Sequence, residues 1–421
     1  MFSGGAVISG VVVVLDCEAT FDAIGSCASG VPAWGVTVRA TAVVPPTTAP
    51  MTAASTVALM GKTRCGGQCI IIRYLCEMSY TYGMKVGIVG ASGFLGLELL
   101  RLCAGHPEFE VVTAMASSQA GEAAAVRYPS LAAAYPDLRF DPMDTEPLVG
   151  LDLVFLALPH GESQRIVPGL LGQVGAVVDL AADFRLTEPE LYETWYGHRH
   201  GAPELLGSFA FGIPELFRGQ IADSAAVAVA GCYPTAAALA LAPLVRAGAV
   251  SPEGIVVDAA SGVSGAGSGL SQATAFSTVD EDFRAYGVGN HRHTPEMEQI
   301  LGASVIFTPH LAPMSRGILA TCYGRMARPE VTRTEVMDLY ERAYGSEPFV
   351  VVSGVPPSTK ATAGSNCAQV SAVVDERSGW VVAMCALDNL MKGGSGQAVQ
   401  CANLVVGLPE ETGLATTGLY P

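Results

Sequence analysis

Cys232 is the residue of this chain whose type and position best suit covalent chemistry. It follows an apolar run over 227–231 and precedes an alanine-rich run over 236–245, which predicts a strand and then a helix. A cysteine on the first turn of a helix lies at the positive end of the helix dipole, which lowers the thiol pKa and favours the nucleophilic thiolate. We therefore expect Cys232 to be a nucleophile.

An acid/base partner for this thiolate is predicted in the segment His-Arg-His-Thr-Pro-Glu, at 291–296. Pro295 is expected to open a helix over 296–301, which leaves His291 and His293 in an exposed loop. Histidine titrates near neutrality and can both give and take a proton. A zinc site would need further His or Cys ligands at short spacing, and the neighbouring sequence has none, so we expect no metal.

Three glycines predict a nucleotide site earlier in the chain. Gly90, Gly93 and Gly96 separate an apolar run over 85–90 from a helical pattern over 97–103, and a second strand is expected over 110–115. Glycines let the backbone turn sharply, approach a ligand closely and open a helix whose amide groups attract a phosphate. The strand, glycine turn, helix and second strand together indicate dinucleotide binding.

The residues after the second predicted strand favour NADP over NAD. Ser117, Ser118 and Gln119 stand where an NAD site usually has an acidic residue that holds the ribose 2′-hydroxyl. Small hydroxyl side chains are better suited to a 2′-phosphate. The glycine- and serine-rich run over 261–268 offers consecutive backbone amides that suit an oxyanion such as phosphate.

Two further apolar runs, over 151–158 and 176–180, alternate with helical stretches and predict a parallel sheet. His160 and Arg185 follow these strands and are expected at the carboxyl edge of the sheet, where such sheets bind ligands. From 232 to about 387 the pattern is richer in strands, which predicts a mixed sheet that also builds a subunit interface.

The composition bounds the kind of protein. Half of the 421 residues are hydrophobic and 15% are charged, which is enough for a large core. The net charge of −16 argues against a general nucleic-acid binder. No stretch has the roughly 20 apolar residues that a membrane-spanning helix needs.

The first 83 residues differ from the rest of the chain. They hold five of the eleven cysteines but no histidine, and no basic residue precedes the apolar run at 6–15 as a signal peptide would require. The Pro/Thr/Ala-rich stretch over 43–55 is typical of a linker. We predict that residues 1–83 are a poorly ordered extension, or are translated from upstream of a true start at Met84.

From Lys85 to about Pro421 the motifs together resemble the N-acetyl-gamma-glutamyl-phosphate reductase family. They are GASGFLG at 90–96, LALPHG at 156–161, DLAADFRL at 179–186, FGIPEL at 211–216, GCYPTA at 231–236, SGVSGAG at 261–267, HRHTPE at 291–296, SRGI at 315–318, GSN at 364–366 and DNLMKGGSGQAVQ at 388–400. GCYPTA and HRHTPE at this spacing are highly specific. Two positions depart from the family: Ser268 and Gln119 stand where it usually or often has a basic residue.

The resemblance implies an α/β fold with a Rossmann-type NADP-binding domain at 84–231, an α+β catalytic and dimerisation domain of the semialdehyde dehydrogenase type at 232–387, and a segment at 388–421 that returns to the first domain. It implies a homo-oligomer, dimer or tetramer, acting in the cytoplasm in arginine biosynthesis. The reaction is NADPH-dependent reduction of N-acetylglutamyl phosphate to the semialdehyde through a cysteine thioester.

The resemblance also assigns the site residues. The catalytic residues are Cys232 as nucleophile and His291 as acid/base. The cofactor residues are Gly90, Ser92, Gly93, Phe94, Leu95, Gly96, Ser117, Pro159, Gly262 and Asn389, and the substrate residues are Arg185, Ser261, Ser264 and His293.

Three alternatives remain open. A related enzyme could act on carrier-linked aminoadipyl phosphate in lysine synthesis or on aspartyl phosphate as an aspartate-semialdehyde dehydrogenase, although HRHTPE disfavours the latter. A regulatory homologue that binds NADP without catalysis is disfavoured because both Cys232 and His291 are present.

Overall fold

The structure is a computed structural model that describes residues 2–8, 11–26, 32–39, 55–65, 68–78 and 83–420, in two units divided between Thr81 and Tyr82. In the first unit, β1 (Phe2–Ile8), β2 (Val11–Ser26) and β3 (Pro32–Arg39) form an antiparallel sheet, and β4 (Ser55–Cys65) pairs with β5 (Gln68–Met78). The predicted linker at 43–55 lies, apart from Ser55, outside the described residues. The status of residues 1–83 as an added extension stays a prediction.

The second unit begins with a six-stranded parallel sheet in the order β10-β11-β9-β8-β6-β7. Its strands are β6 (Met84–Val89), β7 (Phe109–Met115), β8 (Leu153–Leu156), β9 (Ala176–Asp179), β10 (Ala210–Gly212) and β11 (Ala226–Val229). Strands β8, β9 and β11 are buried along their whole length, as expected where helices cover both faces. The prediction of a parallel sheet is confirmed.

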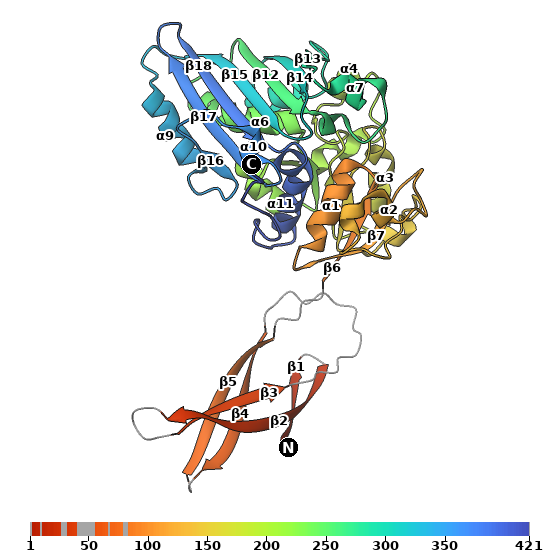
Figure 1. The fold of residues 1–421 in the computed structure, drawn as a ribbon, viewed down its shortest axis with the longest axis vertical. Coiled ribbons are helices and arrows are strands. Elements are labelled where there is room, and N and C mark those ends of the chain that lie inside the picture. Colours follow the sequence, from red (N-terminus) through yellow and green to blue (C-terminus); the bar gives the residue numbers. More distant parts are fainter. Residues whose placement is uncertain are drawn as a thin grey trace. The chain divides into compact units, whose positions relative to one another are not determined.

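Helices cover both faces of this sheet. On one face, α1 (Phe94–Ala104) and α11 (Gly396–Val405) share a buried hydrophobic cluster with β6 and β8, and they lie side by side in Figure 1. On the other face, α3 (Ser163–Leu170) packs into a second cluster. The C-terminal segment therefore packs against this parallel sheet, although many residues separate it from the strands of the sheet in sequence.

A seven-stranded mixed sheet forms the rest of the unit, in the order β13-β14-β12-β15-β18-β17-β16. Its strands are β12 (Ile255–Gly262), β13 (Arg284–Ala285), β14 (Val305–Ala312), β15 (Ile318–Arg325), β16 (Val350–Val352), β17 (Ala368–Asp375) and β18 (Trp380–Leu387). Only the pairs β12–β14 and β16–β17 are parallel. The predicted mixed sheet is therefore present.

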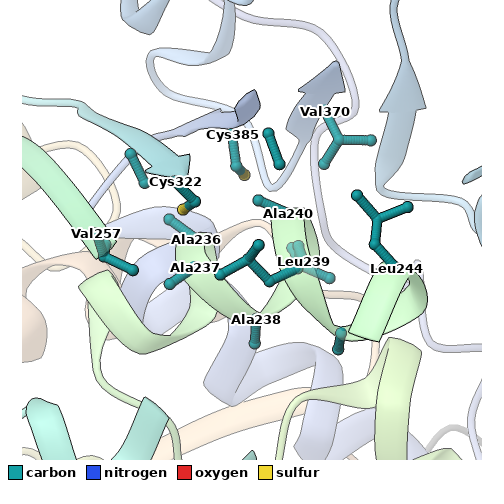
Figure 2. Packing of buried hydrophobic residues seen from close by; sticks show 14 of the residues in the cluster. Ala236, Ala237, Ala238, Leu239, Ala240, Leu244, Val257, Cys322, Val370 and Cys385 are labelled. Atoms are coloured by element: carbon teal, nitrogen blue, oxygen red, sulfur yellow. The ribbon is translucent and has the colours of Figure 1, made fainter. Parts of the chain in front are cut away.

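One face of the mixed sheet packs against α6 (Cys232–Arg246), α8 (Thr294–Leu301) and α9 (Arg333–Tyr344). Figure 2 shows Ala236, Ala237 and Ala240 of α6 on the side of the helix that faces Val257, Cys322 and Cys385 of the strands. Pro243 inside α6 has no N–H for the Leu239 carbonyl, and the Tyr344 hydroxyl donates to that carbonyl instead, at 2.9 Å. The helix that begins at Cys232 is therefore held firmly along its length.

The remaining elements of the described residues 83–420 are short. They are α2 (Ala124–Arg127), α4 (Pro189–Tyr196), α5 (Pro214–Ala222), α7 (Phe276–Val279), α10 (Thr359–Thr362), five 3₁₀ helices (Pro129–Leu131, Glu146–Leu148, Pro203–Ser208, Val263–Ala266, Gln272–Thr274) and one π-helical turn (Met391–Ser395). Among the described residues, no helix is both long enough and apolar enough to cross a membrane.

Candidate active site

The glycine turn after β6 can be built only without side chains at two positions. Gly90 has a φ of +86°, and a Cβ there would lie 2.3 Å from the Ala157 carbonyl oxygen. A Cβ at Gly96 would lie 2.4 Å from the Gly90 carbonyl oxygen. Gly90 thus shapes the turn, and Gly96 lets α1 pack closely against it.

A cavity of about 1240 Å³ extends from this turn to Cys232. All of the predicted cofactor residues except Gly96 and Gly262 line it: Gly90, Ser92, Gly93, Phe94, Leu95, Ser117, Pro159 and Asn389. The cavity passes the start of α1, where a phosphate is favoured, and its lining runs from residues after β7 to residues after β11, which suits an extended ligand. These residues fit a dinucleotide.

Gly262 was predicted to bind the cofactor, but it does not line this cavity. Its N–H donates to the Gly317 carbonyl at 2.9 Å, and a Cβ there would lie 2.7 Å from the Arg316 backbone nitrogen. The strand β12 therefore presses this glycine against the neighbouring backbone, and the residues that line the cavity come later in the same loop, at 264–270. Gly96 also packs against neighbouring backbone, at Gly90, and does not line the cavity.

A second cavity, of about 720 Å³, lies on the other side of Cys232. Predicted residues Ser261, His291 and His293 line it, together with His160, Tyr196, Tyr286 and Arg292, among others. Cys232, Gly265, Ala266 and His293 line both cavities. The nucleophile candidate therefore lies where an elongated cavity meets a smaller one.

The surroundings of Cys232 are close-packed. It is the first residue of α6, with Gly231 as the N-cap. A Cβ at Gly393, in the π-helical turn, would lie 2.8 Å from the Cys232 Cβ. A Cβ at Gly231 would lie 2.5 Å from His293 Nε2, so the imidazole of His293 lies directly against the residue before the cysteine.

The pKa of Cys232 is raised, whereas the sequence predicted that it would be lowered. Burial raises the pKa of the Cys232 thiol to about 11, although the Arg185 charge and nearby backbone N–H groups lower it. The helix dipole alone predicts a lowered value, but desolvation of the thiolate outweighs it here. Cys232 is therefore a thiol at neutral pH.

This pKa gives a direct prediction for chemical modification. Because only the thiolate is alkylated, the rate of Cys232 modification by iodoacetamide should rise about tenfold per pH unit between pH 7 and 10, without a plateau. Peptide mass spectrometry resolves Cys232 from the other cysteines. A plateau below about pH 8 would mean that the thiol is activated before substrate binds.

The two histidines are not exposed as predicted. The His291 ring contacts the rings of Tyr233, Tyr286 and Phe307 edge to face, and the His293 side chain is only 18% exposed. The helix α8 packs on α6, which carries the preceding loop inward. Burial lowers the pKa of His291 to about 3 and lowers that of His293 well below its usual value. Both rings are therefore neutral at neutral pH.

A hydrogen bond fixes the tautomer of His291. Its Nδ1 accepts from the His293 backbone N–H at 3.1 Å, so the neutral ring carries its proton on Nε2. By contrast, His293 Nδ1 is buried and has no hydrogen-bond partner within the described part of the chain. His291 Nε2 is therefore a proton donor as the loop stands.

Glu296 joins several parts of the site, although the sequence assigned it no role. Its carboxylate is fully buried and pairs with Arg185 Nη1 at 3.0 Å. It also accepts the Gly231 N–H at 2.9 Å and lies 4.0 Å from His293 Nε2. The first turn of a helix is where an acidic residue is expected, and that was the available signal.

Arg185 lines the larger cavity and donates two hydrogen bonds inside the protein. Besides Glu296, its Nη2 donates to the Leu180 carbonyl at 2.7 Å. Its Nε is buried and unpaired within residues 83–420. Arg185 therefore supports Glu296, and its contact with substrate stays a prediction.

Ser264, a predicted substrate residue, and Asn389, a predicted cofactor residue, contact each other. Asn389 Nδ2 donates to Ser264 Oγ at 3.0 Å, and Asn389 Oδ1 accepts the Gly317 N–H at 2.8 Å. Asn389 thus fixes the loop that lines both cavities. Sequence reasoning missed Tyr196, whose buried hydroxyl has no partner in the described chain and whose ring packs against the Arg292 guanidinium, 5.5 Å away.

Comparison with known proteins decides the family. The semialdehyde dehydrogenase NAD binding domain matches residues 85–224, and the semialdehyde dehydrogenase dimerisation domain matches residues 232–389. The N-acetyl-gamma-glutamyl-phosphate reductase of Symbiobacterium thermophilum is 47% identical over 348 residues, which are 80% of this chain and 99% of that protein. The chain belongs to the N-acetyl-gamma-glutamyl-phosphate reductase family.

Other members of the N-acetyl-gamma-glutamyl-phosphate reductase family agree. That of Pseudomonas savastanoi pv. phaseolicola is 43% identical over 80% of this chain and 100% of its own length. Aspartate semialdehyde dehydrogenase II of Vibrio cholerae, solved in complex with ASA, has the same fold: its TM-score is 0.58 at 18% identity, over 77% of this chain and 98% of that one. The predicted family and fold class are confirmed, as is an NAD(P)-binding domain.

Proposed function

We propose that this chain reduces N-acetylglutamyl phosphate to N-acetylglutamate semialdehyde and phosphate, with NADPH, in arginine biosynthesis. The observation that carries the proposal is that Cys232 lies at the junction of the elongated cavity and the smaller cavity. An acyl group on the sulfur would reach both. Curated relatives with 43–48% identity carry the name of this activity.

The larger cavity would hold NADPH along the glycine turn, Ser117 and the loop at 264–270. When bound, NADPH supplies the hydride that reduces the acyl group. NADPH is preferred over NADH because residues 116–119, directly after β7, include no carboxylate to hold a free 2′-hydroxyl.

Cys232 begins the reaction by forming a bond from sulfur to the acyl carbon, while the carbon–oxygen bond to phosphate breaks and phosphate leaves with the electron pair. Its thiol proton passes to an oxygen of the departing phosphate in the same step, because the pKa near 11 leaves little free thiolate. The resulting thioester is reduced to a thiohemiacetal. His291 Nε2 then gives its proton to the developing oxyanion and takes it back as the carbon–sulfur bond breaks.

Substitution of the two histidines should separate their roles. His291→Asn should lower kcat by about 100-fold or more at every pH from 6 to 9, the usual range for losing a general acid, because the His291 ring stays neutral over this whole range. His293→Asn should act mainly on KM, because His293 lines both cavities. Steady-state kinetics from pH 6 to 9 measure both effects, and equal effects of the two substitutions would show that the roles are misassigned.

We also propose a homo-oligomer that forms through the mixed sheet. On the face away from α6, cross-strand neighbours form an apolar row over five strands: Ile306, Val256, Tyr323, Val382 and Val373. Ile306 and Val373 are 65% and 42% exposed. A dimerisation domain is the matching family description.

Size-exclusion chromatography with light scattering should therefore give a molar mass of at least two chains. Val382→Asp should lower the mass toward that of one chain, because a carboxylate cannot be buried in an apolar interface without a partner. An unchanged mass with this variant would place the interface elsewhere.

The function itself is tested by following NADPH oxidation with N-acetylglutamyl phosphate. The aminoadipyl and aspartyl phosphates are run beside it, because related reductases act on acyl phosphates of this type. A kcat/KM at least tenfold higher for N-acetylglutamyl phosphate supports the proposal. A higher value for either competitor would reassign the substrate, and no oxidation with any of them would favour a non-catalytic role.

A further inference from the structure

A positive side chain lies at the end of the larger cavity that is nearest to β7. Arg127, the last residue of α2, lines this cavity together with Ser117 and Gln119, which follow β7. In doubly wound folds the ribose of a dinucleotide lies beyond the end of the second strand, and a nearby Arg accommodates a 2′-phosphate. Arg127 reaches this place from a different element than the loop after β7.

Contacts hold the Arg127 side chain at the cavity wall. Its Nε donates to the Ser92 carbonyl at 3.1 Å, and the Tyr128 hydroxyl donates to the same carbonyl at 2.6 Å. The guanidinium carbon lies 5.5 Å from the centre of the Tyr128 ring. Ser92 belongs to the glycine turn, so Arg127 is fixed relative to the phosphate-binding part of the cavity.

The outer nitrogens of Arg127 remain available. Within residues 83–420, neither Nη atom donates a hydrogen bond, and Glu122 is the only carboxylate within 4.0 Å, at 3.6 Å from Nη1. The Arg127 side chain is 27% exposed. A guanidinium held through Nε presents its Nη groups as a fork, which matches the oxygens of a phosphate.

Gln119 cannot serve this purpose. Its Oε1 accepts from Ser92 Oγ at 2.9 Å, and its Nε2 donates to Ser118 Oγ at 2.6 Å. The amide is uncharged and its polar atoms are already paired. A positive charge for a 2′-phosphate must therefore come from another residue.

We infer that Arg127 binds the 2′-phosphate of NADPH and sets the preference for NADPH over NADH, and that Glu122 weakens this contact by competing for the guanidinium. The inference rests on the proposed use of NADPH. It adds which side chain discriminates between the two cofactors. Because the two residues act oppositely, their substitutions should change affinity in opposite directions.

The test is calorimetric titration of the full chain with adenosine 2′,5′-bisphosphate and with AMP, which differ in the 2′-phosphate and need no turnover. NADPH and NADH are titrated in parallel. Arg127→Gln should weaken adenosine 2′,5′-bisphosphate and NADPH by at least about tenfold and leave AMP and NADH within twofold. Arg127→Lys should lose less, because it keeps the charge without the fork.

Glu122→Gln should bind adenosine 2′,5′-bisphosphate about two to five times more tightly, in the range of an exposed ion pair. Arg139→Gln is the matched control. Arg139 is exposed, donates a hydrogen bond to the Gly121 carbonyl and does not line the cavity. Its substitution should therefore leave all four affinities unchanged. Thermal unfolding checks that each variant folds. If Arg127→Gln does not fold, the gain in Glu122→Gln decides.

The outcomes separate the two proposals. If the unmodified chain binds neither NADPH nor NADH, the proposed function fails. If it prefers NADPH and Arg127→Gln keeps that preference, or Glu122→Gln gains nothing, the inference about Arg127 is overturned.

Discussion

Cys232→Ala should lower kcat by at least about 1,000-fold while the dissociation constant for NADPH stays within about twofold. The loss is large because the sulfur forms the covalent bond to the acyl group, and no remaining side chain replaces it. Binding persists because the glycine turn and the loop at 264–270, not the thiol, make up most of the larger cavity. Steady-state kinetics and NADPH titration measure the two quantities separately.

Cys103→Ala is the control for this variant. Cys103 of α1 is buried in the hydrophobic cluster that α1 forms with the parallel sheet, and it lines neither cavity. Its loss should leave kcat within about twofold, with a lower unfolding temperature as the expected cost of a small core cavity. If Cys232→Ala turned over like this control, the covalent route would be wrong.

Glu296→Ala should destabilise the protein by about 3–5 kcal/mol, because it leaves the buried Arg185 charge unpaired. It also removes the acceptor of the Gly231 N–H, directly before Cys232, so kcat should fall as well. Glu376→Ala, at an exposed turn, is the matched control and should change stability by less than about 0.5 kcal/mol. Thermal unfolding with activity assays measures both.

A double substitution tests the reason for this loss. Arg185→Leu with Glu296→Gln removes both charges and keeps an acceptor for Gly231, so it should be more stable than Glu296→Ala. If the double variant were equally unstable, loss of packing rather than an unpaired charge would explain the effect.

Local pattern was enough to predict the elements that carry the site. The apolar run before Cys232 and the alanines after it predicted a strand and a helix, and the structure has β11 and α6 there. The glycine turn was predicted equally well, because only glycine tolerates the φ of Gly90 and the close contact at Gly96. Each of these signals lies within a few residues of the structure it specifies.

The predictions that were wrong, and the residues that were not predicted, depend on contacts between distant parts of the chain. The histidines were predicted to be exposed, but α8 packs on α6 and buries them. The same burial raises the pKa of Cys232, which a helix dipole alone does not predict. Arg127 lies eight positions beyond Gln119 in sequence, and only the fold of α2 against Ser92 brings it to the cavity.

The covalent intermediate is the central claim, and mass spectrometry tests it most directly. The protein is mixed with N-acetylglutamyl phosphate without NADPH, quenched in acid and digested. We expect one N-acetylglutamyl group on the peptide that contains Cys232, released by hydroxylamine as a thioester is, with one equivalent of phosphate set free and no adduct in Cys232→Ala. Phosphate release and normal turnover without any adduct on Cys232 would contradict the account.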